Sequence, residues 1–175
     1  MDTRRKLLCA AEALFDRHGF TATGMGRLTR AADMSSRTLY KHAGSKADLI
    51  VAVLAERQQR FLRAIRVQSV EALFAALETW VRREGGRGCL FLRAYGETGG
   101  DAPEIAQAVS TYKAELFDTI EKIVSAETGG THQPELAEQI LVLFEGATWA
   151  AVYRGTGAIN AARQAAVALI QQARS

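Results

Sequence analysis

The amino-acid sequence predicts an all-α fold, in which a head of three short helices is joined by a long helix to a C-terminal helical bundle. Apolar residues recur three and four positions apart along most of the chain, which is the period of an amphipathic helix. The two prolines, Pro103 and Pro134, each precede such a run, where the missing N–H of proline costs nothing. Most of the fifteen glycines lie between runs or near their ends.

Length and composition place the chain among ordinary globular proteins. It has 175 residues, of which 48% are hydrophobic and 23% charged, so it can bury a core without disulfides or a structural metal. No apolar run approaches the roughly 20 residues of a membrane span. The segment 1–6 leads into an amphipathic run rather than an apolar signal core, so we expect a cytoplasmic protein with no membrane partner.

The first third of the chain contains short helices separated by polar turns. A helix with an apolar stripe from Leu7 to Phe15 is expected to end at Gly19. Shorter helices follow at 25–32 and 36–41, with a turn at 33–35 between them. After Gly44, the segment 45–48 has the pattern of a capping box, with Ser at the cap and Asp three residues later, and it opens a long helix to about residue 66.

Five more helices are predicted in the remainder of the chain, and they are separated by glycine-rich breaks or prolines. The longest apolar stripe, from Ile105 to Ile123, begins just after Pro103. The expected helices are 69–83, 89–97, 103 to about 123, 134–154 and 158–174. The last two are rich in alanine, and such small side chains permit close packing either within the domain or against a second copy of the chain.

The net charge of +3 conceals an uneven distribution. Residues 1–66 contain thirteen Lys and Arg against six Asp and Glu, whereas residues 67–175 contain nine against thirteen. The head therefore carries +7 and the rest −4, which favours a polyanion as the partner of the head, although short windows of any sequence differ by a few charges.

The segment 25–41 has the anatomy of a helix-turn-helix, in which two short helices are joined by a turn of three or four residues. Leu39 is expected to anchor the second helix inward. The other side chains of that helix carry groups that bond phosphate or base edges: Ser36, Arg37, Thr38, Tyr40 and Lys41. Arg27, Arg30 and Lys46 would flank the duplex, and Lys46 also lies at a helix N-terminus, which favours anions.

Residues 4–54 resemble the DNA-binding head of TetR-family (tetracycline-repressor-like) transcriptional regulators. The resemblance is carried by residues in matching order and without a gap: Leu8, Ala10-Ala11, Leu14-Phe15, Gly19-Phe20, Thr23, Leu28, Ala32, Ser35, Thr38-Leu39-Tyr40-Lys41-His42, Ser45-Lys46 and Leu49. It implies that the helix from Ser35 to His42 enters the major groove of double-stranded operator DNA. It also implies that Thr23, Arg27, Tyr40, His42 and Lys46 contact the phosphate backbone.

Several positions depart from the family pattern. Asp33 replaces the usual turn glycine, although Asp tolerates left-handed backbone better than most residues. Ala43 replaces a large aromatic residue, Gly24 a hydroxyl residue and Thr29 a small alanine, while Arg37 replaces a small residue and adds a base or phosphate contact. We expect a working module with altered specificity.

The rear half resembles, more loosely, the C-terminal half of one TetR-type subgroup. The matching residues are Gly88-Cys89-Leu90-Phe91, Pro103, Lys113 and Glu145-Gly146-Ala147. The resemblance implies a homodimer through the last two helices and a small effector bound between helices. The candidates for an apolar effector pocket are Trp80, Phe91, Tyr95, Tyr112, Phe117 and Trp149, although each of them, taken alone, is more often a core or interface residue.

Other chemistry has little support in the sequence. Cys89 follows a glycine-rich loop and Arg87 and begins a helix, so it is either a redox-active or electrophile-sensing thiol or a buried structural cysteine. The three histidines show no metal-ligand spacing, and no cofactor motif is present. We also find no phosphate loop, nucleophile elbow or HExxH motif, and therefore expect no enzyme.

The sequence thus predicts two domains, a DNA-binding head at 1–46 and an effector-binding and dimerisation domain at 47–175, with a connecting helix at about 46–66. The predicted function is a dimeric, ligand-released repressor. Two alternatives remain open at this point. One is an architectural DNA-binding protein without an effector. The other is a helical interaction module that has lost DNA binding, which the substitutions at Gly24, Thr29 and Ala43 suggest.

Overall fold

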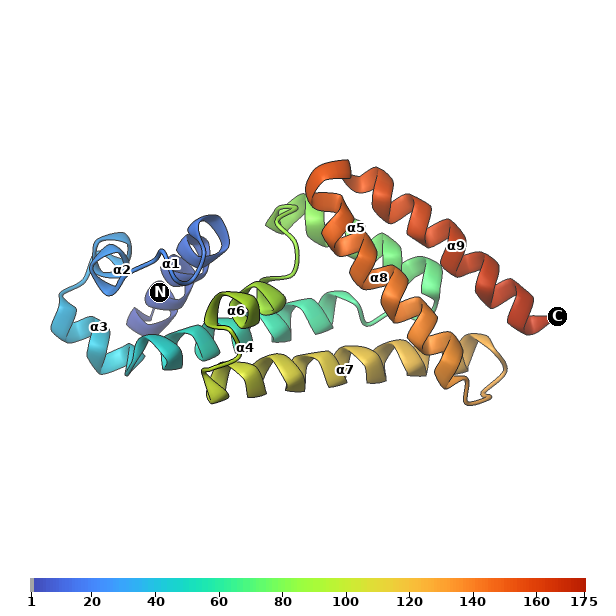
Figure 1. Cartoon of the computed structure of the whole chain (residues 1–175), viewed down its shortest axis with the longest axis horizontal. Helices are drawn as coiled ribbons and strands as arrows, with labels where there is room; N and C mark the ends of the chain where they lie inside the picture. Colours follow the sequence, from blue (N-terminus) through green and yellow to red (C-terminus); the bar gives the residue numbers. More distant parts are fainter. Residues whose placement is uncertain (1) are drawn as a thin grey trace. The chain divides into compact units, whose positions relative to one another are not determined.

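A computed structural model describes residues 2–175, and over this range it contains nine α-helices and no β-strand (Figure 1). The predicted all-α fold is therefore confirmed. The helices are α1 (Thr3–His18), α2 (Met25–Ala32), α3 (Ser36–Ala43), α4 (Lys46–Ala64), α5 (Val70–Glu84), α6 (Leu90–Thr98), α7 (Pro103–Glu127), α8 (Pro134–Arg154) and α9 (Thr156–Arg174).

The chain divides into two compact units. The first consists of the residues up to Gln59 together with Leu90–Thr111, and the second of Arg60–Cys89 together with Tyr112–Ser175. Helices α4 and α7 each run from one unit into the other, and α6 belongs to the first unit although the head precedes it by almost fifty residues. The functional boundary at residue 46 stays a prediction.

The connections between the first three helices follow from local backbone preferences. Gly19 ends α1 with φ 86°, and its N–H donates to the carbonyl of Phe15 at 2.9 Å. Asp33 ends α2 in the left-handed region, with φ 50° and ψ 59°, so Asp adopts the left-handed conformation expected at this turn. Helix α3 continues to Ala43, two residues beyond the predicted end at Lys41.

A small apolar core holds α1, α2 and α3 together. Leu7, Leu28 and Leu39 are fully buried, one from each helix, and the rings of Phe15 and Phe20 stack at 4.8 Å between centroids. Because α1 packs on both α2 and α3, these contacts fix the angle between the two helices of the helix-turn-helix.

The second unit is built around a cluster of aromatic side chains on α4, α5, α7 and α8. The ring of Phe61 lies 4.9 Å from Trp80, 6.3 Å from Tyr112 and 6.2 Å from Phe144, and Phe74 lies 5.7 Å from Phe144. Helix α9 packs against α8 and α5. It begins at Thr156, so Gly157 lies inside the helix and not in the predicted break, because Gly155 alone, with φ 65°, makes the turn.

The predicted capping box at the start of α4 is confirmed. The N–H of Asp48 donates to Ser45 Oγ at 3.0 Å, and the N–H of Ser45 donates to Asp48 Oδ2 at 2.8 Å. The Ser45 hydroxyl also donates to Asp48 Oδ2, at 2.7 Å. These bonds stabilise the ionised carboxylate and lower the pKa of Asp48, with the backbone bond as the largest cause.

We therefore predict that Ser45→Ala lowers the free energy of unfolding by about 1 kcal/mol, because a helix cap is lost. Since the pKa of Asp48 is lowered on folding, its contribution to stability is complete above the ordinary pKa of 3.8 and is lost as the pH falls through the lower folded value.

Urea unfolding of wild type and Ser45→Ala between pH 2 and 7 measures both effects. The wild type should lose more stability on acidification than the variant, because the variant keeps only the backbone part of the carboxylate's bonding. Identical pH profiles with identical free energies would contradict the capping role.

Candidate nucleic-acid interface

Helix α3 has one buried face and one exposed polar face. Leu39 is fully buried and Ala43 is 7% exposed, so the predicted inward anchor is confirmed. Ser35, Ser36, Arg37, Tyr40 and Lys41 are exposed. Thr38 and His42 are half-buried, whereas Tyr40 is 52% exposed. The helix thus presents hydroxyl, guanidinium and ammonium groups on a rigid base.

Both ends of α3 are held by side chains. Ser35 Oγ accepts a hydrogen bond from the N–H of Thr38 at 3.1 Å and lies 2.9 Å from Thr38 Oγ1. At the other end, Arg4 Nη1 on α1 donates to the carbonyl oxygen of His42 at 2.8 Å. Because Arg4 places a cation at the C-terminus of the helix, it also interacts favourably with the helix dipole.

Two of the predicted flanking cations are oriented by neighbours in the head. Arg27 Nη2 lies 2.8 Å from His18 Nε2. Loss of hydration lowers the pKa of His18, and the charges of Arg27 and Arg17 lower it further, so the imidazole is neutral at pH 7 and accepts from Arg27. Lys46 Nζ lies 3.5 Å from the carbonyl oxygen of Thr21, in the first turn of α4.

The placement of Thr23 corrects one predicted contact. Its side chain is fully buried, and its hydroxyl donates to the carbonyl oxygen of Gly19 at 2.7 Å. The position just ahead of α2 is turned inward because this bond closes the connection between α1 and α2. Thr23 therefore stabilises the turn, and in this structure its buried hydroxyl is not accessible to a phosphate.

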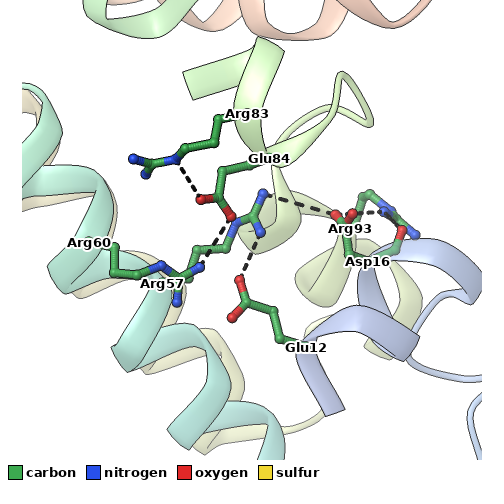
Figure 2. A network of polar contacts seen from close by, with 7 residues as sticks. All are labelled: Glu12, Asp16, Arg57, Arg60, Arg83, Glu84 and Arg93. Atoms are coloured by element: carbon green, nitrogen blue, oxygen red, sulfur yellow. Dashed lines mark hydrogen bonds and ion pairs between the residues drawn. The ribbon is translucent and has the colours of Figure 1, made fainter. Parts of the chain in front are cut away.

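A network of ion pairs ties the second half of α1 to α4 and α6 (Figure 2). Arg57 Nη1 on α4 lies 2.9 Å from Glu12 Oε1, and Arg57 Nη2 lies 4.0 Å from Asp16 Oδ1. Arg93 on α6 approaches the same carboxylate of Asp16 at 3.9 Å. Arg57 is only 6% exposed and Asp16 9%, so these charges are held in a desolvated setting.

Helix α6 also binds the backbone of the head. Arg93 Nη1 donates to the carbonyl oxygen of Asp16 at 2.8 Å. Glu97 Oε2 accepts from the N–H of Phe20 at 2.6 Å and from the N–H of Thr21 at 2.8 Å. The sequence alone assigns no role to Glu97 or Arg93, because no local pattern links a residue to a turn more than seventy positions earlier.

The six predicted pocket residues are spread over both units. In the first unit Phe91 is buried, whereas Tyr95 is 46% exposed and its ring covers Gly100. In the second unit Trp80 and Tyr112 pack on Phe61 in the core, and Phe117 is half-buried. Trp149 is 39% exposed and lies against Gly88, where an added Cβ would come within 2.6 Å of the indole ring.

Cys89 is half-buried in the second unit, and Lys113 Nζ donates to its Sγ at 3.5 Å while also pairing with Glu145. Whether this thiol reacts stays a prediction.

Within residues 2–175, no group of three or more His, Cys, Asp or Glu side chains is arranged to hold a metal ion. Over the same range, no helix combines the length and apolar character that a membrane crossing requires.

Helix α3, the second helix of the helix-turn-helix, exposes a polar and basic face while its other face packs in the core of the three-helix head. These features define the head as a helix-turn-helix DNA-binding module. Residues 7–53 match the model of the bacterial regulatory proteins of the tetR family. The chain is also 36% identical over 64 residues to the HTH-type transcriptional regulator UidR of Escherichia coli K12. That match covers 37% of this chain and 33% of UidR, so it spans about a third of the relative.

Solved structures extend the likeness to the whole fold. A TetR-family transcriptional regulator from Streptomyces coelicolor superposes with a TM-score of 0.90 at 22% identity, covering 99% of this chain and 96% of that one. A proposed TetR-type regulator from Streptomyces avermitilis gives 0.82 at 26% identity, covering 99% and 98%. Salmonella enterica GusR gives 0.75 at 22%, covering 97% and 95%. The head of this chain therefore matches the tetR family, and the chain as a whole has the fold of TetR-family transcriptional regulators.

Proposed function

We propose that this protein is a homodimeric, sequence-specific repressor that binds operator DNA through α3 and is released by a small molecule. The observation that carries the DNA-binding part is the division of α3 into a buried face at Leu39 and Ala43 and an exposed face with Arg37, Tyr40 and Lys41. The match of residues 7–53 to the tetR family supports it.

The exposed groups divide into base and phosphate contacts. Arg37 is exposed near the N-terminus of α3, where recognition helices contact base edges, and a guanidinium binds guanine O6 and N7 in a bidentate manner. Ser35, Ser36 and Thr38 supply hydroxyls at the same end. Arg27, Tyr40, Lys41, His42 and Lys46 supply the phosphate contacts that fix the position of the head.

We predict different effects for the two kinds of contact. Arg37→Ala should cost about 1–3 kcal/mol on the preferred duplex and relax the preference at one base pair. Lys46→Ala should weaken all duplexes alike and reduce the slope of log affinity against log salt by about 1.

The experiment selects duplexes from a random-sequence pool with the wild-type protein and measures affinities for a selected and a scrambled duplex by fluorescence anisotropy. An intact wild type with no preference for the selected duplex would contradict the proposal and would favour an architectural protein if both duplexes bind, or an interaction module if neither does.

The dimer proposal rests on an unpartnered apolar face of α8 and α9. Every third or fourth residue along α8 is exposed on one side: Val142 (63%), Gly146, Trp149 and Tyr153 (78%). The exposed side of α9 carries Ala161, Ala165 and Ala168. A groove of about 510 Å³ runs between the two helices, with Val142, Leu143, Ala165 and Leu169 in its lining.

This surface fits a second copy of the chain. Its small residues permit close helix approach, and nothing lies within 4 Å of a Cβ added at Gly146, so the space there is open to another helix. A two-fold dimer would also supply the second recognition helix that half-sites about 34–36 Å apart require.

We predict that Val142→Glu separates the dimer, because the introduced carboxylate would be buried without a partner at the interface. Sedimentation equilibrium should show a monomer, and affinity for the selected duplex should fall. Ser110→Glu, which adds the same charge at an exposed position on α7, should remain dimeric. A dimer that survives Val142→Glu at micromolar concentration would contradict this interface.

For the effector we propose contact with the aromatic residues of the second unit, among which Trp80 and Tyr112 share Phe61 as a neighbour. The chain has two tryptophans, Trp80 and Trp149, and both lie in this unit. We predict that small molecules that quench the fluorescence of Trp80 in a Trp149→Phe variant also release the selected duplex. Saturable quenching without release would contradict the coupling.

A further inference from the structure

We propose that Arg93 and Glu97 of α6 are positioning residues for DNA binding, because together they hold the end of α1 and the turn that leads into α2. The proposal deepens the proposed function and rests on it. It concerns side chains that touch no DNA and that follow the helix-turn-helix by about fifty residues in the sequence.

The two side chains lie one helical turn apart on α6 and bind complementary ends of the backbone. Arg93 donates to the carbonyl oxygens of Asp16, at 2.8 Å, and Phe15, at 3.4 Å, which belong to the last turn of α1. A cation at the carbonyl end of a helix is favoured by the helix dipole. Arg93 also faces the Asp16 carboxylate, which Arg57 shares from α4 (Figure 2).

Glu97 binds the amides that immediately follow α1. Both N–H groups, of Phe20 and Thr21, donate to the same oxygen, Oε2. The Thr21 hydroxyl donates to the backbone carbonyl of Glu97 at 3.3 Å. Bonds to a charged acceptor are about twice as strong as neutral ones, and the bonding fixes the orientation of two successive peptide groups.

The sequence of the turn is adapted to this contact. Gly19 has φ 86°, and a Cβ at this position would come within 2.8 Å of Glu97 Oε1. Glycine therefore serves both the backbone conformation and the approach of the carboxylate. Phe20 is 1% exposed and stacks on Phe15, so the peptide that Glu97 holds is also anchored in the core of the head.

The held peptide is connected to the proposed DNA contacts. The carbonyl oxygen of Thr21 accepts from Lys46 Nζ at 3.5 Å. Thr21 is therefore bonded to Glu97 of α6 through its N–H and to Lys46, a proposed phosphate contact, through its C=O. Four residues after Thr21, α2 begins and carries Arg27. A change at Glu97 therefore shifts where α2 and Lys46 stand relative to the duplex backbone.

The test compares Glu97→Ala, Glu97→Gln and the exposed control Glu104→Ala on a duplex selected from a random pool and on its scrambled counterpart. Glu97→Ala should lose roughly 2- to 30-fold in affinity for the selected duplex. It should keep its affinity for the scrambled duplex, since every basic side chain remains. Glu97→Gln keeps one oxygen that accepts both amides, so its affinity should lie between wild type and Glu97→Ala. Glu104→Ala should match wild type.

A measurement without DNA accompanies the binding data. Amide hydrogen exchange at Phe20 and Thr21 should accelerate in Glu97→Ala and less in Glu97→Gln, while melting remains cooperative. Unchanged affinity for the selected duplex in Glu97→Ala, or in Glu97→Gln with accelerated exchange if Glu97→Ala does not fold, would overturn the proposal. A wild type that does not prefer the selected duplex would overturn the proposed function itself, and the exchange data would still decide whether α6 holds the turn.

Discussion

The structure of the head depends on the charged contacts made to the second half of α1. Glu12 and Asp16 pair with Arg57 of α4, and Arg93 of α6 joins Asp16. Buried ion pairs contribute little net stability because desolvation offsets their attraction, but removing one partner leaves a costly unpaired charge. Such a network therefore favours one geometry over its alternatives. Here it sets the position of α1, on which both α2 and α3 pack.

Residues far outside the helix-turn-helix therefore help to form the DNA-binding part of the molecule. The helix-turn-helix itself is a short segment, but its frame includes the first part of α4 and the whole of α6. The apolar core of Leu7, Leu28 and Leu39 gives the head its stability, while the charged contacts determine how the turn after α1 is held. Helix α6 belongs to the first unit, whereas the segment that precedes it, Arg60–Cys89, belongs to the second. The chain therefore passes from the second unit to the first immediately before α6.

Much of the fold follows from patterns that are local in sequence. Helical periodicity and glycine breaks gave the nine helices with ends mostly within one or two residues, and the capping box at Ser45 was correct in each of its bonds. Leu39 was correctly predicted to face inward because it is the one aliphatic residue among the polar residues of segment 36–41. The buried position of Thr23 could not be predicted, since the carbonyl oxygen of Gly19 that accepts its hydroxyl is not visible in any pattern of side chains.

The contacts of α6 could not be predicted for the same reason. Arg93 and Glu97 look like ordinary charges on a short helix, and their partners are backbone groups of residues 15–21, which any sequence would supply. A local pattern identifies a helix and its capping residues, whereas long-range bonds to the main chain depend on how helices meet in space. The one sign of these contacts in the sequence is Gly19, because a side chain at this position would clash with the carboxylate of Glu97.

A structure of the protein bound to a duplex selected from a random pool tests the central claim most directly. The account predicts that α3 lies in the major groove with Arg37 on a base edge, that Lys46 contacts a phosphate, and that Glu97 still accepts the amides of Phe20 and Thr21. A complex in which α3 lies outside the groove, or in which DNA is bound while Glu97 has left the turn, would contradict it.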